Sequence, residues 1–362
     1  MSRHAFRDFD EFADSIEGIA GRFVPTKRSS ADWWVEAVPA GRLSLQQVQI
    51  GGAATFAGDG QLGCVTVGMP MTHPLRIHID GGRLDEGSFL FLKPQQPFTF
   101  ASGDATRWAG ITVPIGHRLL EPEVADAAHE SGTARSRAPL PHVVGLREVA
   151  ARLCAADESI SITNPVSASA TEQEIVVAVS RMLEHSTRIR EMQHGRFYHS
   201  RQRVIGRTLE LIEASDGQPL HIADLCEATE VSERTLRNIF NDYFGVTPIR
   251  LIKLRQLREI RIALAATDPE HDTVAQVAER FGIWDFSLFA RNYRRLFGEN
   301  PSQTLRLPPG RLGASDNLSW LDCAMRIFIE EARPAPPLVE IAEGPFAVAP
   351  AVMGARLTSS RA

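Results

Sequence analysis

The sequence predicts a multidomain α+β protein with an N-terminal jelly-roll-like β domain, a helical connector and a C-terminal all-α domain with two helix-turn-helix units. Short apolar runs separated by Gly, Pro and Asp fill residues 35–115. From about Glu121 the pattern changes to helical periodicity. Near the C-terminus one segment is repeated at an offset of 53 residues, as expected when one supersecondary unit is used twice. A length of 362 residues allows two or three domains.

The N-terminal runs have the length and spacing of strands in a sandwich or barrel, with no long helical period between them. They are Leu43–Val48, Gly63–Val67, Leu75–Ile79, Ser88–Leu92 and Gly110–Val113.

Residues 121–142 are rich in Ala, Arg, Ser and Pro and form the expected connector. Helices are predicted over Glu172–Met192 and Arg201–Ser215 because apolar side chains recur near one face of each. In the first, these side chains are Ile175, Val179, Met182 and Ile189. The expected domains are residues 1–125, a connector at 126–197 that could pair two chains, the all-α domain at 198–307, and a tail at 308–362 that is partly disordered.

The repeat superposes Phe244–Pro248 on Phe297–Pro301. In the first unit, at about 220–243, we expect a helix over Ile222–Thr229, a tight turn, and a second helix that Ser232 caps and Gly245 ends. Leu236, Ile239, Phe240 and Tyr243 would face inward.

In the second unit, at about 273–297, Thr273 starts the first helix and Gly282 supplies the turn. Asp285 caps the second helix, which would bury Phe289, Tyr293 and Leu296. Between the units, residues 248–266 form a helix of about 28 Å, close to the roughly 34 Å between successive major grooves on one face of DNA.

The exposed faces of the two second helices are the candidate DNA-binding surface, because arginine and amide side chains there can contact phosphates and base edges. The candidates are Glu233, Arg234, Arg237, Asn238, Ser287, Ala290, Arg291, Arg294 and Arg295.

The net charge of -5 argues weakly against a nucleic-acid partner, but the sum hides an asymmetry. Residues 196–311 hold 17 Lys and Arg against 15 Asp and Glu, while the remainder holds 22 against 29. The four cysteines lie far apart in the sequence, and their spacing matches neither a zinc site nor a disulfide framework. We therefore expect buried, reduced thiols. With no apolar run of about 20 residues and no signal-peptide core, we expect a cytoplasmic protein.

The stretch Val277–Ser302 and the segment Leu225–Phe240 resemble the AraC/XylS family of bacterial transcription regulators. The resemblance covers about 110 C-terminal residues and implies that Arg234, Arg237 and Asn238 read bases in the first unit. Ser287, Ala290 and Arg291 would do so in the second. Departures from the family pattern include Glu230, Cys226, Gln256, Ile260 and Ile283, of which Glu230 occupies a turn position that usually holds Gly.

More weakly, residues 8–120 resemble the cupin-like sensor domain of one AraC branch, through the phrase Leu84–Pro94. Cupin enzymes hold a metal through several histidines and a carboxylate. Here His73 and His78 are five residues apart, and Pro97 and Phe98 stand where the late histidine of a cupin metal site is expected after Pro94, so we expect no metal, no cofactor and no catalysis.

A small-molecule effector pocket is the expected role of the β domain. Arg76, His78, Phe98 and Trp108 are the candidate effector-binding residues, with Trp33, Trp34, Met71 and Phe100 as further lining. If Arg76 and His78 alternate inward on one strand, a carboxylate effector would fit.

The expected function is sequence-specific transcription regulation, with activation in response to a small organic effector. Duplex DNA, the effector, a second copy of the chain and RNA polymerase are the expected partners. Two alternatives remain open at this stage: an effector-independent regulator whose β domain only dimerises, and a cupin enzyme fused to a DNA-binding domain.

Overall fold

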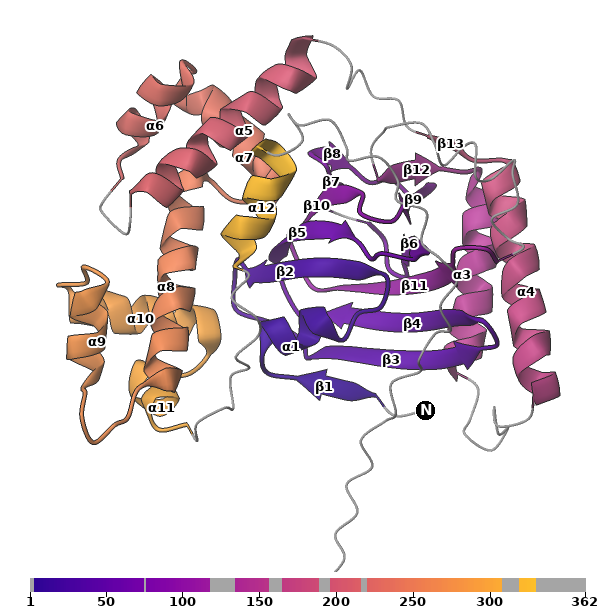
Figure 1. Ribbon diagram of the computed structural model, residues 1–362, viewed down its shortest axis with the longest axis horizontal. Coiled ribbons are helices and arrows are strands. Elements are labelled where there is room, and N and C mark those ends of the chain that lie inside the picture. Colours follow the sequence, from indigo (N-terminus) through magenta and orange to yellow (C-terminus); the bar gives the residue numbers. More distant parts are fainter. Residues whose placement is uncertain are drawn as a thin grey trace, which may run out of the picture.

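Two antiparallel sheets stack face to face in the N-terminal domain of the computed structural model, which describes residues 3–74, 76–117, 134–155, 165–188, 196–215, 220–307 and 319–329 (Figure 1). The larger sheet has the spatial order β1 (His4–Phe6), β3 (Trp33–Ala40), β4 (Leu43–Ile50), β11 (Thr106–Pro114), β6 (Cys64–Pro70), β9 (Ser88–Leu92), β12 (Arg135–Arg137) and β13 (Thr187–Arg188). The smaller has the order β2 (Ile19–Pro25), β5 (Ala54–Gly60), β10 (Pro97–Ser102), β7 (Ile77–Ile79) and β8 (Gly82–Arg83).

Aromatic side chains fill the space between the two sheets. Phe23 and Phe56 come from the smaller sheet and Trp33 and Trp108 from the larger, and all four belong to one buried cluster. Phe12 of the short helix α1 (Phe9–Asp14) completes this cluster with its ring edge against Trp33. The predicted β domain is confirmed, although β2, β3, β5 and β10 were not singled out as runs in the sequence.

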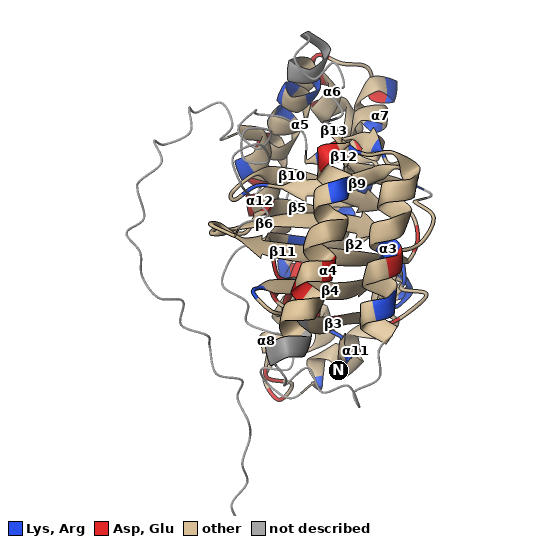
Figure 2. Ribbon diagram, turned by 90° about the vertical axis from the view of Figure 1, so that its right-hand side faces the viewer, with Lys and Arg blue, Asp and Glu red and all other residues tan. Residues whose placement is uncertain are grey.

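Two antiparallel helices, α3 (Leu140–Ala155) and α4 (Pro165–Glu184), cover the outer face of the larger sheet (Figure 2). The predicted helix over residues 172–192 therefore exists, but it begins and ends earlier in the chain. Its predicted apolar side chains Ile175, Val179 and Met182 are buried against the sheet, and Ile189 lies outside the described residues. The apolar stripe of α4 is thus used within its own domain.

The C-terminal domain consists of helices that pack on the opposite side of the molecule from α3 and α4 (Figure 1). They are α5 (Arg196–Ala214), α6 (Ile222–Thr229), α7 (Glu233–Phe244), α8 (Pro248–Ala266), α9 (Val274–Arg280), α10 (Phe286–Phe297), α11 (Pro301–Leu305) and α12 (Trp320–Ile329). The first unit has a core that α5 and α12 share, and the second has a separate core closed by α11.

Helix α12 lies between the two domains (Figure 1). One face packs on α5, where the backbone approaches so closely that a Cβ added at Gly206 would lie 3.0 Å from the carbonyl oxygen of Phe328. The other face packs on β2 and β5, so that Val24 and Ala57 join the core of the helical domain. The sequence analysis assigned this segment to the C-terminal tail. Helix α12, in the described part of that tail, contacts both domains and links them.

The four cysteines are free thiols, two of them buried and two partly buried. Burial raises the pKa of Cys154 to about 12, so this thiol is protonated at neutral pH. Over the described ranges, no helix combines the length and the apolar character that crossing a bilayer requires.

Candidate nucleic-acid interface

The first helix-turn-helix unit forms where the cap and turn residues predicted it. Helix α6 ends at Glu230, which adopts the left-handed conformation with φ of 57° and so carries the strain expected of a non-glycine residue there. The Ser232 hydroxyl accepts a hydrogen bond from the backbone N–H of Thr235 and starts α7. Gly245, with φ of 67°, ends α7.

Helix α7 buries the predicted side chains Leu236, Ile239, Phe240 and Tyr243. Its opposite face is exposed and carries the predicted residues Glu233, Arg234, Arg237 and Asn238. The Arg237 guanidinium contacts the Glu233 carboxylate one turn earlier, so the first turn of α7 presents an ion pair to solvent. Such an exposed pair contributes little to stability, which leaves Arg237 able to exchange its partner for a base.

The second unit repeats this construction. Thr273 and Gln276 form a capping box at the start of α9, Gly282 turns the chain with φ of 71°, and the Asp285 carboxylate accepts from the N–H of Leu288. The hydroxyl of buried Tyr293 donates a hydrogen bond of 2.7 Å to the Thr304 hydroxyl, which in turn donates to the Glu299 carboxylate, and this joins α10 to α11. Burial raises the pKa of the Tyr293 hydroxyl well above its usual range.

The exposed face of α10 carries Ser287, Arg291, Arg294 and Arg295, and Ala290 beside them is half-buried. Sequence reasoning missed the apolar side chains that flank this face. Trp284, Phe286 and Leu288 are 76%, 38% and 42% exposed. All three lie in the turn or in the first turn of α10, outside the helical period of the buried residues. This position would have allowed their exposure to be predicted from the sequence.

Helix α8 fixes the two units relative to each other and to the β domain. Its predicted bounds are confirmed, with Thr247 before it and Pro248 in its first turn. Near the middle of α8, the Gln256 side-chain amide donates to the carbonyl of Phe281 in the second unit, at 2.7 Å. A helix of 19 residues is about 28 Å long, so the connecting helix α8 has a length close to one turn of DNA.

A cavity of about 80 Å³ lies between the sheets of the β domain. The cross-strand partners Gly68 in β6 and Gly110 in β11 both line it, and a Cβ added at Gly110 would meet nothing within 4 Å. The predicted effector residues Phe98 and Trp108 line it, and the buried Trp108 indole N–H lacks a hydrogen-bond partner among the described residues.

The other two predicted effector residues do not line this cavity. Arg76 precedes β7 with φ of 59°, and its side chain is 72% exposed. Within β7, Ile77 and Ile79 face the core, whereas half-buried His78 faces α7. Burial lowers the pKa of the His78 imidazole, with Asp242 opposing this shift. Of the four predicted effector residues, Phe98 and Trp108 therefore line the cavity and Arg76 and His78 do not. The Arg76 guanidinium is not available to a ligand in the cavity.

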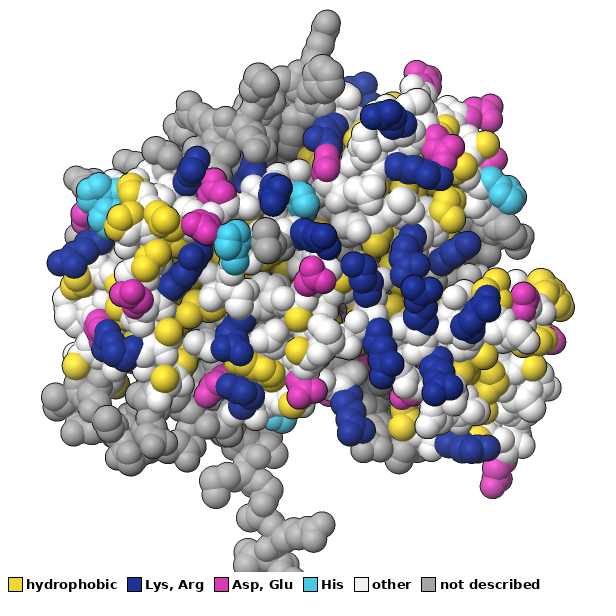
Figure 3. Space-filling view, turned by 180° about the vertical axis from the view of Figure 1, so that it is seen from behind, with side chains coloured by type: hydrophobic (Ala, Val, Ile, Leu, Met, Phe, Trp, Pro, Cys, Tyr) yellow, Lys and Arg dark blue, Asp and Glu magenta, His cyan; other side chains and the backbone are white. Residues whose placement is uncertain are grey.

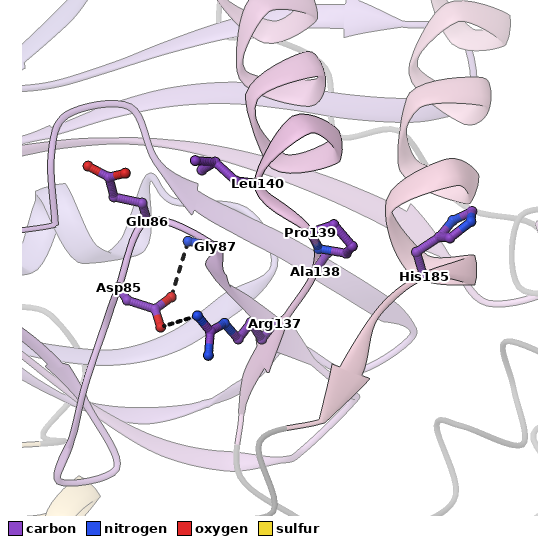
Figure 4. Close-up of a pocket in the computed structure, with 8 residues that line it drawn as sticks. All are labelled: Asp85, Glu86, Gly87, Arg137, Ala138, Pro139, Leu140 and His185. Atoms are coloured by element: carbon purple, nitrogen blue, oxygen red, sulfur yellow. Dashed lines mark hydrogen bonds and ion pairs between the residues drawn. The ribbon is translucent and has the colours of Figure 1, made fainter.

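A wider hollow of about 580 Å³ opens on the surface between β8, β9, β12 and the ends of α3 and α4 (Figure 4). Its charged side chains already have partners. Arg137 points at Asp85, with 3.2 Å between Nη2 and Oδ2, and Glu86 pairs with His73 at 3.0 Å. Across the part of the chain that the structure describes, no three His, Cys, Asp or Glu side chains gather in a way that could hold a metal ion.

Comparison with known proteins finds similarity concentrated in the helical domain. Residues 225–307 match the family model of a helix-turn-helix domain. A probable thc operon regulatory protein of Rhodococcus erythropolis is 32% identical over 108 residues, which are 30% of this chain and 32% of that protein. A XylDLEGF operon transcriptional activator of Pseudomonas putida is 34% identical over 100 residues, 28% of this chain and 31% of that protein. The chain thus matches about a third of the length of these curated relatives.

Among solved structures, a probable AraC family transcriptional regulator from Rhodopseudomonas palustris CGA009 is 32% identical over 28% of this chain and 94% of that chain, with a TM-score of 0.26. The AraC-like transcriptional activator CuxR matches 71% of this chain and 94% of that chain at 15% identity, with a TM-score of 0.39.

Proposed function

We propose that this chain, whose C-terminal domain is of the AraC/XylS type, is a transcription regulator that places α7 and α10 in successive major grooves of duplex DNA. The observation behind the proposal is that two capped helices of the same construction expose polar and basic faces and are joined by the single helix α8, whose length is close to one turn of DNA. The curated relatives are named as regulators and activators of operons, which supports activation as the sign of regulation.

Base reading is assigned to Arg237 and Asn238 in α7 and to Ser287 and Arg291 in α10, because these exposed side chains lie within the first two turns of each helix. Arg294 and Arg295 follow on the last turn of α10, where phosphate contacts are expected.

Arg237→Ala is expected to weaken binding to the cognate site by roughly 1–3 kcal/mol and to relax specificity at one base pair. Arg294→Ala serves as the matched control, since loss of a phosphate contact weakens all sequences alike. Gel-shift titrations over a panel of variants of an operator selected from genomic DNA measure both. A uniform loss for Arg237→Ala across the panel would remove its base-reading role.

For the β domain we propose a small, largely apolar effector with one hydrogen-bond acceptor. The cavity lining supplies aromatic and aliphatic side chains, and the Trp108 N–H, unpartnered within the described ranges, would donate to the acceptor. Among the described residues, Glu17 is the one charged residue that lines the cavity. The location of Arg76 outside the cavity removes the reason to expect a carboxylate. At about 80 Å³ the cavity is smaller than the roughly 300 Å³ of ordinary ligand pockets, so a ring-sized effector requires lining side chains to move.

A ligand present at about 100 times its Kd should stabilise the chain by about 2.7 kcal/mol. Thermal unfolding in the presence of small aromatic and aliphatic carbonyl compounds measures this gain. Gly110→Val, which fills the space that the glycine leaves, should abolish the gain for the same compound. If the variant keeps the full gain, the compound binds elsewhere.

Dimerisation and contact with RNA polymerase stay predictions. The outer surface of α3 and α4 exposes Leu140, Val144 and Val177, which makes it the surface on which we propose that two copies meet.

A further inference from the structure

Both DNA-reading helices end against the β domain. A Cβ added at Gly245, which ends α7, would lie 3.5 Å from the Cβ of Ala101 in β10. One added at Gly298, which ends α10, would lie 3.6 Å from Nε of Arg28 in the loop between β2 and β3. The β domain therefore reaches the same end of each of the two helices.

The loop between β2 and β3 presents two exposed cations at this junction, Lys27 and Arg28. It is held from both sides: Lys27 Nζ donates to the carbonyl of Gly103 at 3.3 Å, and Arg250 of α8 donates to the carbonyl of Thr26 at 2.9 Å. The backbone that carries the two charges is thus fixed to the β domain and to the helix that spaces α7 and α10.

Arg76 adds a third cation beside this loop. A Cβ added at Gly103 would lie 3.0 Å from the Cβ of Arg76, and Gly103 is the residue whose carbonyl Lys27 contacts. The guanidinium of Arg76 is 3.8 Å from Asp104, and both side chains are more than two-thirds exposed. An ion pair so exposed is weak, so a phosphate can compete for the arginine.

Figure 3 shows the side of the molecule behind that of Figure 1. There dark blue Lys and Arg side chains gather over the helical domain and where it meets the β domain, with few magenta acidic side chains among them. A predominantly basic surface that spans two domains fits an extended polyanion better than it fits a small ligand.

Groove dimensions place phosphates at this junction. A helix of 12 residues such as α7 or α10 is about 18 Å long, whereas the major groove is about 12 Å wide. When the first turns of the helices contact base edges, the ends at Gly245 and Gly298 lie at the edge of the groove, where the sugar-phosphate backbone runs.

We propose that Lys27 and Arg28, with Arg76 beside them, bind the phosphate backbone of duplex DNA, so that the β domain contributes directly to DNA affinity. This inference rests on the proposed function of the helical domain. In addition to the helix-turn-helix units, the β domain, for which we propose effector binding, would then contact DNA through a second surface that does not depend on the base sequence.

The test uses the full chain and a fluorescein-labelled duplex of random sequence, followed by fluorescence anisotropy across a salt titration. Each neutralised phosphate contributes about -0.9 to the slope of log K against log salt. The double variant Lys27→Ala/Arg28→Ala should therefore have a slope shallower by about 1.8. Between 50 and 200 mM salt the unmodified chain should lose about tenfold more affinity than the variant does.

Two control variants distinguish the loss of positive charge in the loop between β2 and β3 from other effects of substitution. Arg42→Ala removes an exposed β-domain arginine from the turn between β3 and β4, which contacts α4 on the side away from the helical domain, and should leave the slope unchanged. Lys27→Arg/Arg28→Lys keeps both charges and should also keep the slope.

A slope for the double alanine variant equal to that of Arg42→Ala would overturn the inference while leaving the helix-turn-helix proposal intact. A loss of affinity with an unchanged slope would overturn it too, because the loop would then only position the helices. If the unmodified chain bound no duplex DNA at low salt, the proposed function itself would fail.

Discussion

Replacing Asp10 with alanine is expected to lower the free energy of unfolding by roughly 3–5 kcal/mol, the range seen when one partner of a buried ion pair is removed. Asp10 lies at the start of α1 and is almost fully buried. Its carboxylate is 3.7 Å from Nε of Arg22 in β2 and forms a contact ion pair with Arg258 in α8. Without the carboxylate, Arg258 would lose this ion pair and Arg22 would keep Asp14, while both guanidinium groups stay largely shielded from water.

Asp14→Ala is the matched control because Asp14 also pairs with Arg22, at 2.9 Å, but its side chain is 53% exposed. Its removal should cost less than about 1 kcal/mol, as for other solvent-exposed pairs. Urea unfolding of the full chain followed by far-ultraviolet circular dichroism measures both variants. Equal losses of unfolding free energy for the two variants would mean that burial of the carboxylate does not determine how much each ion pair with Arg22 stabilises the fold.

Trp320→Ala is expected to destabilise the chain by roughly 3–5 kcal/mol, as for other large aromatic side chains removed from a core. Trp320 is 4% exposed at the start of α12, and its ring centroid is 5.2 Å from that of Phe244 in α7. Its removal leaves a cavity where the helical domain and the smaller sheet share one core.

Trp284→Ala is the control for this variant, because the Trp284 side chain is 76% exposed and its loss should change the free energy of unfolding by no more than about 0.5 kcal/mol. Thermal unfolding of both variants gives the comparison. A loss for Trp320→Ala as small as that for Trp284→Ala would contradict the position of α12 between the domains.

Local signals predicted the helix-turn-helix units well. Ser232 and Asp285 cap their helices and Gly245 and Gly282 turn the chain, because capping and left-handed turns depend on a few neighbouring residues. The same locality explains why the reading faces of α7 and α10 could be predicted. The exposed residues are those left out of a clear helical period of buried side chains.

Features that depend on distant contacts could not be predicted in this way. Helix α12 is ten residues long, too short to be stable alone, and it forms because it packs between α5 and the smaller sheet. Arg76 and His78 were expected to share one side of a strand, but the left-handed backbone at Arg76 puts it outside β7. The sequence also gives no sign of the cavity beside Gly110, because its lining comes from strands of both sheets that are far apart in the chain.

Methylation interference with the full chain, on an operator selected from genomic DNA, shows whether the two helix-turn-helix units occupy successive major grooves. Guanine N7 faces the major groove, so its methylation blocks binding wherever a reading helix enters. We expect two clusters of interfering guanines on one face of the duplex, with centres about 10 base pairs apart. A single cluster, or two clusters half a turn out of phase, would contradict this expectation.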